Sequence, residues 1–70
     1  MSFSTNLIRL RDLNGWTQEE LAEKIGVSRS TIAKWEVGRG RPMISNLLAL
    51  SDVFGVTVDS LLRGEEKPEC

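Results

Sequence analysis

Two helix starts and one helix stop fall within residues 17–37, and this feature constrains the fold more than any other. Thr17 followed by Glu20 is a capping-box pattern, in which the hydroxyl and the carboxylate each bind a backbone N–H at the helix start. Gly26 predicts the end of that helix, because the residue after a C-cap usually has a positive φ that penalises a Cβ. Ser28 predicts the N-cap of a second helix. The spacing predicts two short helices joined by a tight turn.

The apolar residues of this segment repeat at helical spacing. Leu21, Ala22 and Ile25 share one face of the first helix, and Ile32 and Trp35 share one face of the second. Hydrophobic staples are expected around both caps, Trp16 with Leu21 and Val27 with Ile32. The opposite face of the second helix carries small, uncharged or basic residues, namely Arg29, Ser30, Ala33, Lys34 and Val37. Such a face can approach a groove closely.

Three more helices are expected around this pair. The first begins at a cap on Ser4 or Thr5 and ends at Asn14-Gly15, which tolerate positive φ. Its core stripe is expected to be Leu7, Leu10 and Leu13. The fourth helix is predicted from about Ile44 to Phe54, with Leu47, Leu50 and Phe54 toward the core and Gly55 closing it. Thr57 is expected to cap the last helix and Gly64 to end it.

Length and composition exclude several functions. Seventy residues suffice for one small domain. Histidine is absent and Cys70 is the single cysteine, so we expect no catalytic residues, metal cluster, disulfide or cofactor. No small-molecule site is evident. No apolar stretch approaches the ~20 residues that span a membrane, and the N-terminus lacks a signal-peptide layout, so a cytoplasmic protein is expected.

The charge is distributed unevenly. The net charge is −1, which as an average disfavours nucleic-acid binding. Residues 29–41, however, hold Arg29, Lys34, Arg39 and Arg41 against Glu36, whereas residues 42–70 are acidic in balance. With a Debye length of about 8 Å, a phosphate responds mainly to the face nearest to it. A weakly polarised domain of this kind can bind DNA.

The segments LIRLRDLNGWTQEELA, SRSTIAKWEVGRGRP and LLALSDVFGVTVDSLLRGE follow one another without a gap from about Leu7 to Gly64. Together they resemble the phage-repressor, Cro/CI-like helix-turn-helix family of prokaryotes and phages. The resemblance implies an all-α, compact five-helix lambda-repressor-like domain over residues 1–64. Residues 65–70, EEKPEC, are expected to form a short disordered acidic tail.

The resemblance also implies the residues that contact DNA. In the major groove, base edges would meet Ser28, Arg29, Ser30 and Lys34. The phosphate backbone would meet Thr17, Gln18, Thr31, Arg39 and Arg41. Two positions depart from the family pattern: Val37 stands where relatives often carry a phosphate-contacting polar residue, and Met43 stands where a helix cap is usual. We therefore expect no Val37 contact, and the sequence does not fix the residue at which the fourth helix starts.

One ion pair is expected inside the domain. In the resembling family an arginine at the place of Arg11 pairs with a glutamate at the place of Glu36. Helical geometry supports the pair, because Glu36 projects beside Ile32 and away from the groove-facing side. The alternative is a solvated Arg11.

The function expected from these features is a sequence-specific transcription regulator, a repressor, that binds a palindromic double-stranded DNA operator as a homodimer. Leu48 and Ala49, apolar and outside the core arc, are the candidate dimer interface. Two alternatives remain open. One is the antitoxin of a toxin–antitoxin pair that also controls its own operon. The other is a protein-interaction module that keeps the fold but does not read bases, against which Arg29 and Lys34 count.

Overall fold

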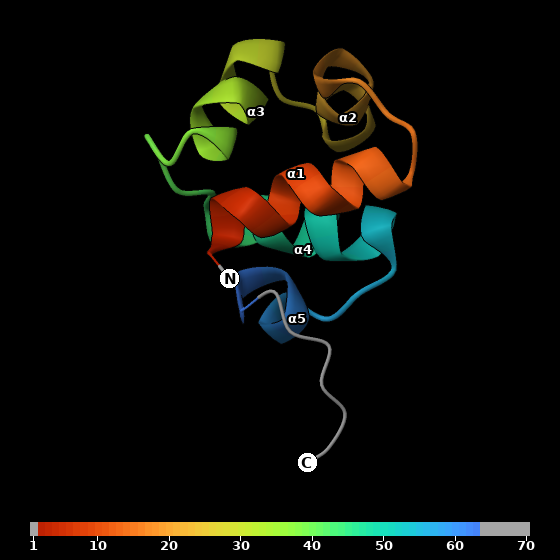
Figure 1. Cartoon of the computed structure of the whole chain (residues 1–70), viewed down its shortest axis with the longest axis vertical. Helices are drawn as coiled ribbons and strands as arrows, with labels where there is room; N and C mark the ends of the chain where they lie inside the picture. The colour runs from red at the N-terminus through yellow and green to blue at the C-terminus, as the bar shows by residue number, and fades with distance from the viewer. Residues whose placement is uncertain (1, 64–70) are drawn as a thin grey trace.

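The computed structural model describes residues 2–63, which form five helices and no strand (Figure 1). The helices are α1 (Phe3–Leu13), α2 (Gln18–Ile25), α3 (Arg29–Glu36), α4 (Ile44–Phe54) and α5 (Val58–Arg63). This architecture confirms the all-α, five-helix prediction. Gly64 and the predicted acidic tail, residues 65–70, lie outside the described residues.

The helices stack along the long axis of the domain. Figure 1 shows α2 and α3 at one end, α1 crossing the middle and α5 at the opposite end. Helix α1 contacts both α3 and α5, while α4 contacts α2 and α5. The α2–α3 pair therefore rests on α1 and α4, which leaves the outer side of α3 free to meet another molecule.

The caps of α2 and α3 form as the sequence predicts. The Thr17 hydroxyl accepts from the Glu20 backbone N–H at 3.0 Å, and the Glu20 carboxylate accepts from the Thr17 N–H at 2.8 Å. Gly26 ends α2 in the left-handed region, with φ of 77°. The Ser28 hydroxyl accepts from the Thr31 N–H at 3.3 Å and starts α3. Side-chain hydrogen bonds thus fix both helix starts.

The start of α1 differs from the expectation. The N-cap is Ser2, whose hydroxyl accepts from the Thr5 N–H at 3.2 Å, so the prediction of a cap at Ser4 or Thr5 was wrong. The earlier start places Phe3 inside the helix, where its ring packs edge-on against Trp35 with centroids 6.5 Å apart. Burial of this aromatic side chain favours the longer helix.

The predicted core stripe of α1 was also partly wrong. Leu7 and Leu10 are buried, but Leu13 is 69% exposed. A step of three residues drifts around a helix by about 60° each time, because three residues turn it by about 300°. The stripe that packs is Phe3, Asn6, Leu7 and Leu10, which has the spacing of an amphipathic helix.

Asn6 is a polar member of this stripe. Its side chain is fully buried, and its amide nitrogen donates to the backbone carbonyls of Ser60 and Leu61 at 3.2 and 2.8 Å. These carbonyls belong to α5, a helix of six residues. Since the last carbonyls of a helix lack intrahelical donors, Asn6 satisfies them and ties α5 to α1.

The hydrophobic core draws on all five helices. Its buried members are Leu7, Leu10, Leu21, Ala22, Ile32, Trp35, Leu50 and Leu61. The predicted core residues Leu47 and Phe54 are half-buried and pack against this cluster. Trp16 stacks on Phe54 with ring centroids 5.6 Å apart. No helix among residues 2–63 has the length and apolarity needed to cross a lipid bilayer.

Helix α4 begins without a side-chain cap. Its N-cap is Met43, which makes no capping hydrogen bond, as the departure from the family pattern led us to expect. Its end is well defined, because Gly55 is left-handed and the Ser51 hydroxyl donates to the Val56 carbonyl at 2.6 Å. Thr57 then accepts from the Ser60 N–H at 3.0 Å and caps α5, as predicted.

Candidate nucleic-acid interface

One side of α3 faces solvent and the other faces the core. Arg29, Ser30 and Lys34 are exposed, whereas Thr31 and Ala33 are half-buried. The opposite side buries Ile32, Trp35 and Glu36. The exposed side carries two cations and a hydroxyl, as the helical geometry of the sequence predicts, and its exposed apolar residue is Val37 at the C-cap, which is 68% exposed.

Ser28 is both the N-cap of α3 and part of its exposed surface. It is exposed, and its hydroxyl lies 3.1 Å from the Ser30 hydroxyl and 2.9 Å from the Thr31 hydroxyl. These contacts cluster three hydroxyl groups at the start of α3. Because a hydroxyl has one donor and two acceptor positions, the cluster keeps hydrogen-bonding capacity toward solvent.

Four cations lie on α3 and on the loop that follows it, namely Arg29, Lys34, Arg39 and Arg41. All four are exposed, and the ion pairs within residues 2–63 involve other arginines. Gly38, with φ of 76°, turns the chain after α3. Together with Ser2, Phe3 and Ser4 at the start of α1, residues 38–42 line an open groove. The loop therefore presents both arginines to solvent.

Glu36, the one acidic residue of α3, does not weaken this positive surface. Its side chain is 5% exposed and accepts from Arg11 Nε at 2.6 Å and from Arg11 Nη2 at 3.1 Å. The predicted Arg11–Glu36 pair is thus confirmed, and it is bidentate. The hydrogen bond to Glu36 raises the pKa of Arg11 above its ordinary value. The pair neutralises the carboxylate inside the domain.

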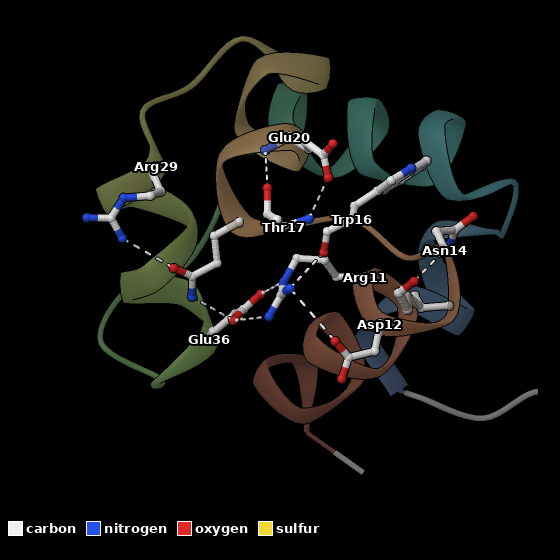
Figure 2. A network of polar contacts seen from close by, with 10 residues as sticks. Arg11, Asp12, Asn14, Trp16, Thr17, Glu20, Arg29 and Glu36 are labelled. Carbon is white, nitrogen blue, oxygen red and sulfur yellow. Dashed lines mark hydrogen bonds and ion pairs between the residues drawn. The ribbon is translucent and has the colours of Figure 1, made fainter.

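Arg11 also holds the entrance to α2. Its Nη1 donates to the Trp16 carbonyl at 2.8 Å, the residue before the Thr17 cap (Figure 2). One guanidinium therefore joins α1, the start of α2 and the end of α3. These hydrogen bonds connect the start of α2 with the end of α3 through one side chain of α1.

Gln18 links this buried pair to the exposed face. Its Nε2 donates to Glu36 Oε1 at 2.9 Å, and its Oε1 accepts from Arg29 Nη1 at 3.3 Å. The family resemblance implied only a phosphate contact for Gln18, and no pattern in the sequence indicated its contact with Glu36, 18 residues away. The structure thereby brings Gln18 together with Arg29, one of the predicted base-contacting residues.

The start of α2 borders the same surface. Thr17 is exposed, and its own N–H is bound by Glu20. The N–H groups of Gln18 and Glu19 belong to the first turn, where an α-helix has no internal acceptors. Backbone donors and the positive end of the helix dipole thus lie beside Arg29, an arrangement that favours an anion.

Residues 2–63 hold no group of three or more side chains suited to a metal ion. The features that meet at the α3 face are cations, hydroxyls, an amide and helix N-termini. Their shared chemistry is hydrogen-bond donation to anions and to polar edges, which is what a phosphate backbone and the major groove accept.

Comparison with known proteins places this geometry in a family. The helix-turn-helix family profile matches residues 7–61. The chain is 48% identical over 66 residues to the HTH-type transcriptional activator BcrR of Enterococcus faecalis, an overlap of 94% of this chain and 32% of BcrR. It is 34% identical over 62 residues to the prophage-derived HTH-type transcriptional regulator YonR of Bacillus subtilis, an overlap of 89% of this chain and 57% of YonR. The chain thus spans about a third to three fifths of the length of these relatives.

The fold is also that of solved repressor domains. It superposes on the P22 c2 repressor in complex with a synthetic operator with a TM-score of 0.88, at 31% identity, covering 93% of this chain and 98% of that one. The family profile, the relatives and the fold agree with the arrangement of α2, Gly26 and α3. The chain belongs to the helix-turn-helix family, of the Cro/CI type.

Proposed function

We propose that this chain is a sequence-specific transcription regulator that inserts α3 into the major groove of double-stranded DNA. The observation that carries the proposal is the polarity of α3. Its exposed side presents Arg29, Ser30 and Lys34, while its single carboxylate, Glu36, is buried against Arg11. A protein-interaction module would expose a mainly apolar face on α3. The exposed side of this helix is instead mainly polar and positively charged.

The residues around α3 supply the contacts that carry no sequence information. Arg39 and Arg41 follow α3 in an exposed loop, and the start of α2 offers its first-turn N–H groups. In this proposal the remaining contacts with the DNA phosphate backbone are made by Thr17, Gln18 and Thr31. Phosphate contacts set the register of the protein on the duplex, and base contacts by Ser28, Arg29, Ser30 and Lys34 set its preference.

Selection from a randomised double-stranded DNA library, followed by mobility-shift titration at several salt concentrations, tests the proposal. We expect one preferred sequence, bound at least 10³-fold more tightly than random DNA. Replacing Arg39 or Arg41 by Ala should weaken binding to all sequences alike. It should also flatten the slope of log affinity against log salt by about two for a dimer that loses one phosphate contact per subunit. A chain that enriches no sequence contradicts the proposal.

We also propose that the chain binds as a homodimer on a palindromic operator and acts as a repressor by occupying a promoter. One recognition helix reads only a few base pairs, whereas two copies would read half-sites about 34 Å apart. P22 c2 is a repressor and its structure is that of an operator complex. These properties belong to that protein and support the proposal for this one.

The first turn of α4 offers a surface for the second copy. Met43, Ile44 and Leu48 are 69%, 68% and 57% exposed, and Ile44 and Leu48 lie one helical turn apart. Ala49 is half-buried and lines a shallow hollow with Lys24, Asp52 and Val53. We therefore keep Leu48 and Ala49 as interface candidates and add Met43 and Ile44, which are more exposed than Ala49.

Leu48→Glu tests the interface, because a carboxylate in an apolar contact is costly to bury. The variant should sediment as a monomer at concentrations where the wild type is a dimer, and it should lose affinity for the full operator while keeping affinity for an isolated half-site. Glu23→Gln, which changes an exposed carboxylate on α2, serves as the control and should leave sedimentation unchanged. A wild-type footprint on one asymmetric half-site at saturation would contradict the dimer.

A further inference from the structure

Asn14 and Gly15 are the one Asn-Gly pair of the chain, and they lie in the turn between α1 and α2. An asparagine side chain can react with the backbone of the next residue. The backbone nitrogen attacks the side-chain carbonyl carbon, Cγ, and a five-membered succinimide ring forms. A side chain on the next residue hinders this approach, and glycine has none. Because the other asparagines, Asn6 and Asn46, each precede a leucine, Asn14 is the residue best placed for this chemistry.

The surroundings of the pair leave room for the ring. Asn14 and Gly15 are both exposed, and apart from the neighbours of Gly15 in the chain no described residue places an atom within 4 Å of the site of an added Cβ. The backbone, however, is not in the reactive conformation. At ψ of −2° the Gly15 nitrogen is in line with the backbone nitrogen of Asn14, whereas ring closure needs it in line with Cβ. The reaction therefore requires rotation about the Cα–C bond of Asn14.

Hydrogen bonds hold both reacting groups away from each other. The Gly15 N–H, which contains the attacking nitrogen, donates to the Asp12 carbonyl at 3.0 Å. The Asn14 Nδ2, which would leave, donates to the Leu10 carbonyl at 2.8 Å. Both acceptors belong to α1, so the end of this helix has to open before the ring can form.

Arg11 holds the turn through its backbone and its side chain. Its carbonyl accepts from the Trp16 N–H at 3.1 Å, and its Nη1 donates to the Trp16 carbonyl at 2.8 Å (Figure 2). The same guanidinium is fixed by its bidentate pair with Glu36, whose side chain is 5% exposed. Rotation at Asn14 would move Gly15 and Trp16 and break the contacts with Arg11. The buried pair thus restrains the bond that has to rotate.

We propose that Asn14 is a site of spontaneous covalent modification whose rate is set by the Arg11–Glu36 pair. When the turn opens, the Gly15 nitrogen gives its proton to solvent and forms a bond with Asn14 Cγ. The bond between Cγ and Nδ2 breaks, and this nitrogen takes up a proton and leaves as ammonia. Water then adds to either carbonyl of the succinimide and opens the ring, which yields aspartate or isoaspartate. Water is the only other reactant.

Either product weakens the turn. A carboxylate at residue 14 only accepts hydrogen bonds, so the donor to the Leu10 carbonyl is lost, and its charge lies at the negative end of the α1 dipole. In isoaspartate the main chain also runs through Cβ and is one carbon atom longer. The added atom displaces Gly15 and Trp16 from Arg11. The modification therefore loosens the start of α2, whatever surface the helix-turn-helix binds.

The experiment follows the chain by mass spectrometry at one pH and temperature, in buffer and in guanidinium chloride that unfolds it. Peptide digestion locates the change in mass from amide to acid, and methylation by an isoaspartyl methyltransferase detects isoaspartate. We expect conversion at Asn14, and none at Asn6 and Asn46 over the same period. Conversion in buffer should be at least about tenfold slower than in guanidinium chloride, because the folded chain opens the turn only rarely. Asn14→Gln should not convert, since glutamine would need a larger ring.

Arg11→Lys tests the influence of the buried pair. Lysine keeps a positive charge beside Glu36, but it lacks the planar fork that contacts Glu36 and Trp16 together. We expect conversion at Asn14 to be about three- to tenfold faster than in the wild type in buffer, and equally fast in guanidinium chloride. Arg63→Lys makes the same replacement at an exposed arginine of α5 and should convert like the wild type. Thermal melts establish that each variant is folded.

Hydrogen exchange of the wild type provides a test that needs no variant. Exchange of the Gly15 N–H requires the same hydrogen bond to Asp12 to open. The factor by which folding slows this exchange should therefore match the factor by which folding slows conversion at Asn14. This test applies even if Arg11→Lys does not fold.

Three results would overturn the proposal. If Asn14 stays unconverted while the chain is unfolded, then it is not a modification site. If folded Arg11→Lys and the wild type convert equally fast in buffer, then the buried pair does not set the rate. If conversion is slowed by a factor unrelated to the exchange of the Gly15 N–H, then opening of this turn is not the step that limits it. None of these results bears on DNA binding, so the proposed function is tested separately.

Discussion

Helices α3 and α4 meet solvent in opposite ways. Helix α3 starts at a hydroxyl cap on Ser28 and exposes cations and hydroxyls, and its single carboxylate is buried in an ion pair. Helix α4 starts at Met43 with no side-chain cap and exposes Ile44 and Leu48. A charged, hydrogen-bonding surface suits a hydrated polyanion, whereas an exposed apolar turn suits a second protein surface.

The difference extends to how each helix is held. The end of α3 is tied to α1 and α2 by buried hydrogen bonds through Arg11 and Gln18. The start of α4 has no such tie, and its stability comes from apolar packing farther along, at Leu47 and Leu50. The molecule thus fixes the geometry of α3 more tightly than the start of α4. Substitutions on the two helices should accordingly have effects of different size and sign.

The largest effect is expected from Arg11→Ala. The substitution removes the partner of a carboxylate that is 5% exposed, and breaking such a buried pair costs on the order of 3 kcal/mol. A small domain has about 5 kcal/mol of stability in total, so the variant should be partly or wholly unfolded at 37 °C. Thermal and urea unfolding of the variant measure the loss.

The double variant Arg11→Ala with Glu36→Gln serves as the control, because it removes the stranded charge and should recover part of the lost stability. If Arg11→Ala lowers the melting temperature by only a degree or so, then the Arg11–Glu36 pair does not stabilise the packing of α3 on α1.

Next in size is Arg29→Ala, which tests the polar face of α3. The variant should lose roughly 1–3 kcal/mol of binding free energy on the preferred operator and relax its preference at one base pair in each half-site. Its fold should be unchanged, because the Arg29 side chain is exposed. Titration of an operator set at several salt concentrations measures both quantities.

Arg39→Ala is the matched comparison, since it removes the same charge from the loop after α3. If Arg29→Ala weakens binding uniformly and Arg39→Ala changes base preference, then the roles of readout and anchoring are reversed. If neither substitution has an effect, then this face does not bind DNA.

Ser28→Ala should destabilise the domain by about 1 kcal/mol, because Ser28 supplies the side-chain cap of α3. For a domain of this size the melting temperature should fall by about 4–8 °C. Ser45→Ala, an exposed serine inside the first turn of α4, controls for the loss of a hydroxyl outside a cap. Equal melting temperatures for the two variants would show that the cap hydrogen bond adds nothing.

The sequence predicted local features of this fold better than contacts between distant residues. The caps at Thr17, Ser28 and Thr57 and the left-handed stop at Gly26 follow from backbone rules that act within four residues, and all four are confirmed. The misplaced cap of α1 shows the limit of these rules. Hydroxyls at residues 2, 4 and 5 could each cap a helix, and the packing of Phe3 on Trp35 decided among them.

The candidate site was predictable to a similar extent. Helical spacing placed Arg29, Ser30 and Lys34 on the exposed side of α3, and the family resemblance supplied the Arg11–Glu36 pair. Neither source indicated that Gln18 would bridge that pair to Arg29, nor that Asn6 would be buried against α5. Both contacts join residues far apart in the chain through amides that helical periodicity does not distinguish.

The smallest effect, and the only stabilising one, is expected from Met43→Ser. The backbone of Met43 already has N-cap dihedral angles, φ −72° and ψ 166°, but its side chain makes no capping hydrogen bond. The introduced hydroxyl can accept from a backbone N–H group of the first turn of α4, which should stabilise the monomer by about 0.5–1 kcal/mol. Urea unfolding, carried out at a protein concentration below the dissociation constant of the dimer, measures this gain in stability.

Met43→Ala separates the cap from the loss of the apolar side chain, since it removes the thioether without adding an acceptor. Both variants should weaken a dimer that uses Met43, whereas only Met43→Ser should stabilise the monomer. Equal monomer stability for the two variants would mean that the start of α4 gains nothing from a cap. In that case α3 and α4 would differ only in the side chains that they expose, and not in how their N-termini are stabilised.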